Sequence, residues 1–368
     1  MDYLPEITRI IDYGLRGQKQ QLYSQINLLI KQLNKKGDIR SAEILLKKIS
    51  VKDEHITPNA FQFNRPIPVE KDNRFPLADF QKFEVNDIWI ELPENLQKNI
   101  DLFLSYLENK EKLKSENIPL NPTMLLYGPP GTGKSKLAAY IASQLSLPLI
   151  TARSDALISS YLGSTSKNIR MLMDYAQEQP CILFLDEFDA LAKGRNDANE
   201  IGELKRVVVS LLQNIDALDN VILIAATNHP ELLDKAVWRR FQYKIEIELP
   251  HKEIREAITK HILSDIDKKN LALFIELTHG LSGADIEAIV YEFKREKVLN
   301  NNLLDFKKLL QLALLSHNNN LTFLKHNIKE EVLYIKKKFN LSYEKIAKIF
   351  AISKTYVGKI LKESIENE

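Results

Sequence analysis

A glycine-rich run near the middle of the chain has the residue types needed to hold a chain of phosphates. Residues Gly128–Ser135 read Gly-Pro-Pro-Gly-Thr-Gly-Lys-Ser and fit the spacing G-x-x-x-x-G-K-[ST]. Glycines let backbone N–H groups close around phosphate oxygens, because no Cβ obstructs them. In this pattern Lys134 reaches the outer phosphates and the Ser135 hydroxyl ligates Mg²⁺. The expected contacts of a phosphorylated cofactor are Gly128, Pro129, Pro130, Gly131, Thr132, Gly133, Lys134, Ser135 and Lys136.

A second motif supplies the groups that phosphate transfer needs besides this loop. The apolar run Cys181–Leu185 is followed directly by Asp186 and Glu187. We expect Asp186 to hold Mg²⁺ together with Ser135, and Glu187 to orient and deprotonate an attacking water. The alternative is a strand that ends in two surface acids. Asp189 is expected just outside the chemistry.

Short apolar runs alternate with helical stretches between residues 83 and 250, and both motifs belong to this pattern. Runs of this length that are rich in Ile, Leu and Val indicate a parallel sheet covered by helices on both faces. The expected strands are Met124–Tyr127, Leu147–Thr151, Cys181–Leu185, Val221–Ala225 and Tyr243–Leu249. The fold class is therefore α/β with a parallel sheet, and the glycine-rich run at the end of one strand resembles the phosphate loop of P-loop NTPases.

The flanking segments have other textures. Residues 1–56 read as a helical region. Residues 57–82 read as a linker or an irregular, extended segment, because four prolines break any helix there. A helical pattern fills 251–315, and the polar stretch 316–320 indicates a hinge. A lysine-rich helical tail follows at 325–368.

Composition excludes several classes of protein. The 368 residues are 44% apolar and 27% charged, which is ordinary for a globular protein. The net charge of +2 creates no general demand for nucleic acid or membrane. The single cysteine, Cys181, excludes an internal disulfide. With no signal peptide and no apolar run of about 20 residues, a cytoplasmic protein is expected.

The ordered motifs together resemble the AAA ATPase module over roughly residues 83 to 315. They are Gly128–Ser135, Leu185–Asp189, Ile224–Asn228, Leu233–Phe241 and the lid-like ending Leu281–Asp285. The run Arg239-Arg240-Phe241, followed by Ile245–Pro250, most resembles the subgroup that contains katanin and spastin. The resemblance implies ATP and Mg²⁺ as cofactors, a homo-oligomeric ring that is usually a hexamer, and a small all-helical lid at 251–315.

The resemblance also implies individual roles. Asn228 would bind the attacking water or the γ-phosphate, and Gly283–Ala284 would pack against the nucleotide. Arg239 and Arg240 would reach the nucleotide of a neighbouring subunit as arginine fingers. Plainer alternatives are a turn asparagine and a salt-bridging arginine pair. Asp87–Ile88 resembles the segment that frames adenine, although its usual glycines are missing and Trp89–Ile90 stands there instead. His261 is a further candidate for contact with the base; the alternative is a histidine on a helix surface.

Tyr161, Leu162 and Gly163 resemble the first pore loop of that family. An aromatic side chain there would grip an extended polypeptide, which implies a protein substrate and allows an associated protease. The alternative is that Tyr161 anchors the loop to its own core.

The tail resembles the helix-turn-helix units of bacterial regulators. Ser342 and Ser353 are placed to cap helices over 343–350 and 354–362, with Ala351 where such turns usually hold glycine. Ten lysines against six glutamates give 325–368 a net charge of +4. Exposed Lys354, Thr355, Tyr356 and Lys359 would suit DNA. The alternative is a trihelical module that contacts protein.

Two functions follow. The first is ATP hydrolysis by an oligomeric AAA ring, coupled to the remodelling, unfolding or disassembly of a protein partner. The alternative is a DNA-associated ATPase regulator or assembly switch that uses the C-terminal helix-turn-helix.

Overall fold

The computed structural model divides the chain into two units, Met1–Asn64 and Arg65–Glu368. In the second unit it describes residues 66–70, 74–85, 87–157, 162–178, 180–192, 210–218, 221–300, 305–318, 321 and 328–365. In the first unit it describes only residues 8, 25, 26, 29 and 33, all of them helical. The helical region expected at 1–56 therefore lies almost wholly outside the described residues.

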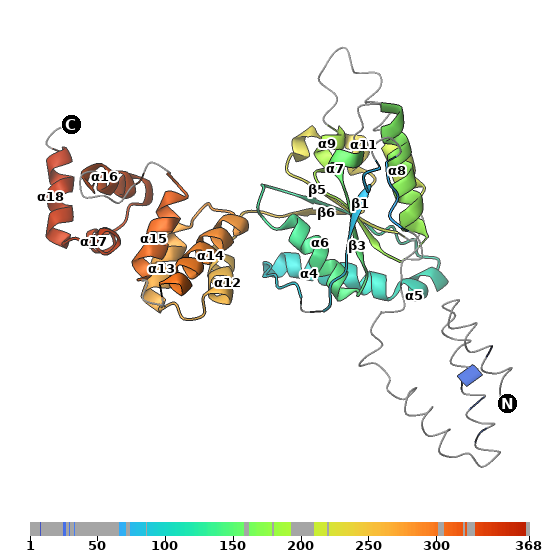
Figure 1. The fold of residues 1–368 in the computed structure, drawn as a ribbon, viewed down its shortest axis with the longest axis horizontal. Coiled ribbons are helices and arrows are strands. Elements are labelled where there is room, and N and C mark those ends of the chain that lie inside the picture. The colour runs from blue at the N-terminus through green and yellow to red at the C-terminus, as the bar shows by residue number, and fades with distance from the viewer. Residues whose placement is uncertain are drawn as a thin grey trace. The chain divides into compact units, whose positions relative to one another are not determined.

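A six-stranded sheet forms the centre of the second unit (Figure 1). Its strands are β1 (Ala78–Gln81), β2 (Thr123–Tyr127), β3 (Leu149–Ala152), β4 (Ile182–Leu185), β5 (Ile222–Thr227) and β6 (Tyr243–Glu246). They lie in the order β1-β3-β4-β5-β2-β6, and every neighbouring pair is parallel except β1 with β3. The α/β class and the five expected strands are confirmed.

Both faces of the sheet are buried, which explains the uninterrupted apolar runs. Met124 and Leu126 pack with α4 (Glu94–Glu108) and α6 (Lys134–Gln144), whereas Leu125 faces the other way and is equally buried. Figure 1 shows α8 (Leu162–Gln177) on the opposite side of the sheet from α6. The shorter helices are α5 (Lys110–Ser115), α7 (Ser154–Leu157), α9 (Phe188–Ala192), the 3-10 turn Pro230–Leu232 and α11 (Lys235–Trp238).

Strand β1 lies within 57–82, the segment expected to be a linker or an irregular, extended stretch. Ala78 to Gln81 pair antiparallel with Ala152 to Leu149. Three of the four β1 residues are exposed, because β1 is an edge strand, so the segment lacks the apolar run that reveals a buried strand.

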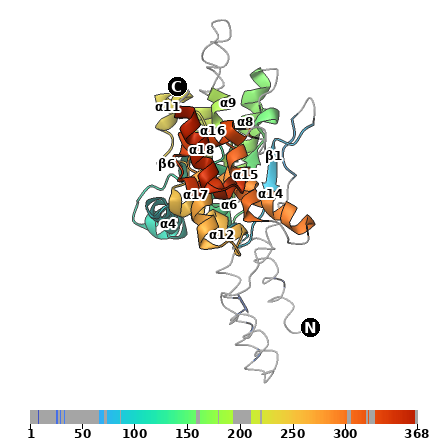
Figure 2. The same cartoon turned by 90° about the vertical axis from the view of Figure 1, so that its left-hand side faces the viewer.

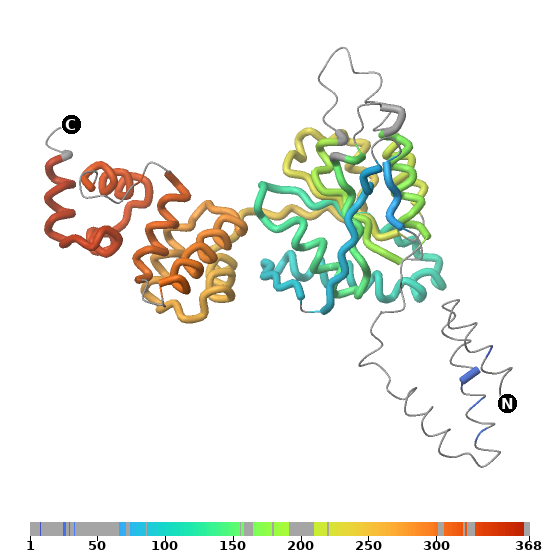
Figure 3. Tube along the Cα trace, viewed as in Figure 1, coloured from blue at the N-terminus to red at the C-terminus, as the bar shows by residue number. Residues whose placement is uncertain are grey.

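Two helical groups follow the sheet along the chain (Figure 3). The lid contains α12 (Lys252–Ile262), α13 (Lys268–Leu277), α14 (Gly283–Leu299) and α15 (Phe306–Leu315). The tail contains α16 (Ile328–Phe339), α17 (Tyr343–Phe350) and α18 (Lys354–Ile365), which lie together in both views (Figures 1 and 2).

Lid and tail share one hydrophobic core, so the stretch 316–320, which was expected to be a hinge, does not separate two independent groups of helices. Leu310 and Leu314 of the lid belong to the same buried cluster as Ile346 and Ile349 of the tail. Gln311 Nε2 also donates to the Ile349 carbonyl at 3.4 Å. The polar stretch connects two groups of helices that pack against each other.

The remaining features of the fold are the buried cysteine and the lengths of the helices. Cys181 is 3% exposed, and burial raises the pKa of its thiol to about 12. Within the described part of the chain, no helix has the length and apolar character needed to span a bilayer.

Candidate active site

The three segments that carry the expected phosphate-binding and catalytic residues each follow one of three neighbouring strands. Strands β4, β5 and β2 are adjacent and parallel, so their carboxyl ends meet at one edge of the sheet. The glycine-rich loop follows β2, Asp186 and Glu187 follow β4, and Asn228 follows β5. Ligand sites in open α/β sheets occur at this edge.

The glycine-rich loop needs its glycines for two different reasons. Gly128, Gly131 and Gly133 have φ angles of 139°, 73° and 99°, which other residues rarely adopt. A Cβ on Gly128 would lie 2.2 Å from the Ile247 carbonyl oxygen. At Gly133 it would meet nothing within 4 Å, so space remains where the loop turns into α6. This geometry fits a cradle for phosphate oxygens.

Lys134 is held beneath the loop rather than in solvent. It is 7% exposed, and its Nζ donates to the carbonyl oxygens of Gly128 and Pro129, both at 2.8 Å. Burial lowers the pKa of Lys134, while the charges of Asp186 and Asp189 act in the opposite direction. A desolvated cation at this position gains from the arrival of an anion.

Ser135 and Asp186, the two expected metal ligands, are in direct contact. Ser135 Oγ donates to Asp186 Oδ2 at 2.7 Å, and the other carboxylate oxygen accepts from the Glu187 N–H at 2.9 Å. A hydroxyl and a carboxylate suit Mg²⁺, which prefers oxygen ligands and keeps several waters. Glu187 has a φ of 49°, uncommon outside glycine and often found at functional sites.

A buried network behind Asn228 was not anticipated from the sequence. Thr227 Oγ1 donates to Asp189 Oδ1 at 2.8 Å and accepts from the His229 N–H at 2.9 Å. Thr227 and Asp189 are 1% and 7% exposed. These hydrogen bonds thus fix Thr227 and His229, the residues on either side of Asn228. A threonine directly before that asparagine was the only signal in the sequence.

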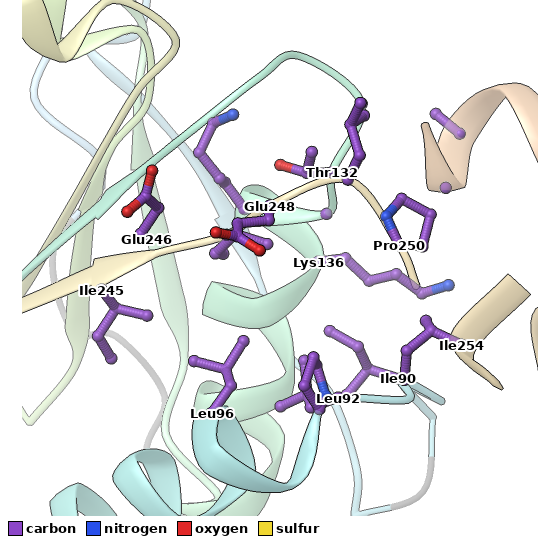
Figure 4. A pocket seen from close by; sticks show the side chains of 18 of the residues that line it. Ile90, Leu92, Leu96, Thr132, Lys136, Ile245, Glu246, Glu248, Pro250 and Ile254 are labelled. Atoms are coloured by element: carbon purple, nitrogen blue, oxygen red, sulfur yellow. The ribbon is translucent and has the colours of Figure 1, made fainter. Parts of the chain in front are cut away.

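One cavity of about 710 Å³ collects these groups. Lys134, Ser135, Asp186, Glu187 and Asn228 line it with the glycine-rich loop. Figure 4 shows Thr132 and Lys136 at this cavity. Its apolar wall includes Ile90, Leu92, Leu96, Ile245 and Ile254. A cavity with a phosphate cradle and an apolar wall fits a nucleoside triphosphate.

The start of α14 closes over the loop. The Ala284 N–H donates to the Gly131 carbonyl oxygen at 3.0 Å, and both Gly283 and Ala284 line the cavity. Ser282 and Asp285 form a capping box that fixes this helix start. Lys136 Nζ pairs with Glu287 Oε1 at 2.7 Å, which links α6 to the lid.

The residues expected around adenine divide into two groups. Trp89 lines the cavity, and its ring stacks on His261 with centroids 3.9 Å apart and planes within 3°. Asp87 does not line the cavity; its carboxylate accepts from the Glu84 N–H at 2.8 Å. The stacked pair therefore connects the part of the cavity wall that contains Trp89 to helix α12, which contains His261.

The two candidate arginines have different environments. Arg240 makes a bidentate pair with Asp216, with Nε–Oδ1 at 3.0 Å and Nη2–Oδ2 at 2.9 Å, and this carboxylate raises the pKa of Arg240. Arg239 is exposed, and its guanidinium makes no ion pair with the described residues. Neither lines the cavity, which contains no arginine among the described residues.

The pore candidates are only partly visible. Tyr161 lies outside the described residues. Leu162 and Gly163 are the first two residues of α8.

Comparison with known proteins agrees with this geometry. The model of the family described as "ATPase family associated with various cellular activities (AAA)" matches residues 124–249. The chain contains an AAA ATPase domain. The structure titled "Crystal structure of FIGL-1 AAA domain" has a TM-score of 0.52 over 71% of this chain and 92% of that chain, at 24% identity, a likeness of fold.

Several curated proteins are similar to part of this chain. An uncharacterized AAA family ATPase of Sinorhizobium fredii is 47% identical over 38% of this chain and 43% of its own length. A proteasome-activating nucleotidase of Methanocella arvoryzae is 38% identical over 48% of this chain and 45% of its own. The ATP-dependent zinc metalloprotease FtsH of Lancefieldella parvula is 32% identical over 57% and 35%. The chain spans about half the length of these relatives or less. The match to the family model supports an ATPase domain in this part of the chain.

Proposed function

We propose that this chain is a subunit of an AAA ring that hydrolyses ATP and uses the energy to remodel, unfold or disassemble a protein partner. The observation that carries the proposal is the single cavity in which Lys134, Ser135, Asp186, Glu187 and Asn228 meet. The names of the relatives, which include a proteasome-activating nucleotidase and a protease, support a protein substrate.

Each group of the cavity has one task in this proposal. Lys134 and the loop amides bind the outer phosphates, and Ser135 with Asp186 would hold Mg²⁺, which when bound would neutralise phosphate charge. Glu187 takes the proton of the attacking water. Asn228 orients that water or the γ-phosphate. Gly283 and Ala284 bring the lid against the nucleotide.

A ring is part of the proposal because the cavity of one copy lacks an arginine among the described residues. Transition-state charge in phosphoryl transfer is commonly stabilised by an arginine, and no arginine lines this cavity among the described residues. Arg239 is exposed and unpaired with that part of the chain, whereas Arg240 is already bound to Asp216. We therefore assign the arginine finger to Arg239 of an adjacent copy.

Mixing two inactive variants tests this assignment. Glu187→Gln should bind ATP with Mg²⁺ but not hydrolyse it, and Arg239→Ala should lose turnover for lack of the finger. In mixed rings, a Glu187→Gln subunit supplies Arg239 to the intact site of an Arg239→Ala neighbour. Random mixing should restore about a quarter of the wild-type rate, because that fraction of interfaces pairs the two intact groups.

Subunit exchange is confirmed separately by co-purification of two affinity tags. Mixed rings that show no recovered turnover would rule out a finger supplied in trans. Hydrolysis by Glu187→Gln at the wild-type rate would remove Glu187 as the base.

For the protein partner, Tyr161→Ala should keep ATP turnover and lose remodelling of whatever the ATP-trapped Glu187→Gln ring retains from its host. Undiminished remodelling would exclude the pore.

A further inference from the structure

Helix α18 is held on the tail by one side only. Up to Glu363, its buried side chains are Val357, Ile360 and Leu361, which belong to the shared core of lid and tail. Gly358 brings α18 close to α17, since a Cβ there would lie 3.6 Å from the Tyr343 ring. The described side chains on the opposite side of α18 are exposed.

The connection between α17 and α18 fixes the direction of α18. Ala351 adopts a left-handed conformation with φ of 54° and ψ of 44°, and the Ile352 N–H donates to the Ala347 carbonyl oxygen at 3.0 Å. Ser353 Oγ then accepts from the Tyr356 N–H at 3.1 Å and caps the new helix. The two helices predicted from the sequence are thus present, joined by three residues.

The exposed side of α18 is cationic. Thr355, Lys359 and Lys362 follow one another at i, i+4 and i+7, and Lys354 and Tyr356 flank them at the start of the helix. All five are exposed. We call these five residues the α18 face.

The ion pairs around the α18 face do not neutralise it. Within the described residues, Lys354 and Lys362 form no ion pair. Lys359 Nζ lies 3.9 Å from Glu363 Oε1, and the other oxygen of that carboxylate binds Lys329 Nζ at 2.8 Å. Glu363 is thus shared by two lysines.

Positive charge is concentrated in this part of the chain. Residues 328–365 contain nine lysines and four glutamates, with no arginine, histidine or aspartate, which gives a net charge of +5. Because the whole chain carries +2, the remainder carries −3. A basic unit on a chain whose remainder is slightly acidic is the electrostatic footprint of a polyanion site.

We propose that the α18 face binds duplex DNA by entering its major groove. A 12-residue helix is about 18 Å long and fits a groove about 12 Å wide, which A-form RNA does not offer because its major groove is deep and narrow. Lys354, Lys359 and Lys362 neutralise phosphates, and Thr355 and Tyr356 meet base edges. The absence of arginine from 328–365 makes sequence preference weak.

Because the tail shares its core with the lid, the site is tested in the full chain. Binding of a fluorescent duplex of about 20 base pairs is followed by anisotropy between about 50 and 200 mM salt. The triple variant Lys354→Gln, Lys359→Gln, Lys362→Gln should bind more weakly. Its slope of log affinity against log salt should be smaller by about 2.7, because each lost phosphate contact removes about 0.9.

The matched control removes three lysines from α5 through Lys110→Gln, Lys112→Gln and Lys114→Gln, and should keep the wild-type slope. The single exchange Lys359→Glu, on an exposed position, gives a second variant with little risk to folding. The proposal is overturned by no binding at about 50 mM salt, by an unchanged slope in the triple variant, or by equal affinity for an RNA duplex. None of these readouts uses the nucleotide cavity, so they stand apart from the ATPase proposal.

Discussion

The substitution Thr227→Val tests whether the buried network behind Asn228 controls turnover. Valine keeps the shape of threonine but removes the hydroxyl that donates to Asp189 at 2.8 Å and accepts from the His229 N–H at 2.9 Å. A hydrogen bond to a charged group contributes about 1.5–3 kcal/mol and a neutral one about 0.5–1.5 kcal/mol. The variant should therefore lose about 2–4 kcal/mol of unfolding free energy, or about 5–15 °C in Tm.

The effect on catalysis separates positioning from stability. If about 1.4–2 kcal/mol of the loss appears in the transition state, kcat falls about 10- to 30-fold. The KM for ATP should change less than about twofold, because the glycine-rich loop and Lys134 are untouched. Steady-state ATPase assays well below the lowered Tm measure both constants.

Two control variants flank the test. Thr227→Ser restores the hydroxyl and should restore most of kcat. Ile224→Val, on the same buried strand, should cost about 0.5–1.5 kcal/mol of stability and leave kcat as it is. A Thr227→Val enzyme with a lowered Tm but wild-type kcat would show that the network serves folding alone.

Two further predictions concern the tail and the lid. Ala351→Gly should raise the unfolding free energy by about 0.5–1 kcal/mol, because glycine adopts the left-handed conformation without strain. The control Ala347→Gly, in the adjacent helix, should lower the unfolding free energy. Urea unfolding that ranks the two variants in the opposite order would contradict the strain at Ala351. Burial lowers the pKa of His317 below 6.5, and its Nε2 lies 2.7 Å from the Leu277 carbonyl oxygen. The unfolded chain therefore takes up the proton first, and unfolding free energy should fall as the pH drops below about 6.5. His317→Gln should remove that part of the pH dependence, and an unchanged profile would refute it.

The sequence predicts the buried parts of the fold well and the edge poorly. Strands such as β4 are buried on both faces, so each is an uninterrupted apolar run. The caps at Ser342 and Ser353 were also predictable, because capping depends on residues only three positions apart. Edge strand β1 has no such run, and its partner β3 lies about 70 residues away.

In the active site, local motifs were predictable and long-range partners were not. The contact of Ser135 with Asp186 follows from two motifs on neighbouring parallel strands. Nothing local indicates that Arg240 binds Asp216, or that Trp89 stacks on His261 across 172 positions of the chain. These partners come from tertiary packing, which neither periodicity nor spacing encodes.

The single buried thiol has a practical consequence for following motion in this protein. A thiol whose pKa is raised to about 12 by burial is almost entirely protonated near pH 7.5 and reacts slowly with maleimides. A cysteine introduced at exposed Thr355 would then carry a fluorophore or spin label almost alone, with no need to replace Cys181. Its signal during ATP turnover would report whether nucleotide exchange at the cavity changes the environment or mobility of helix α18.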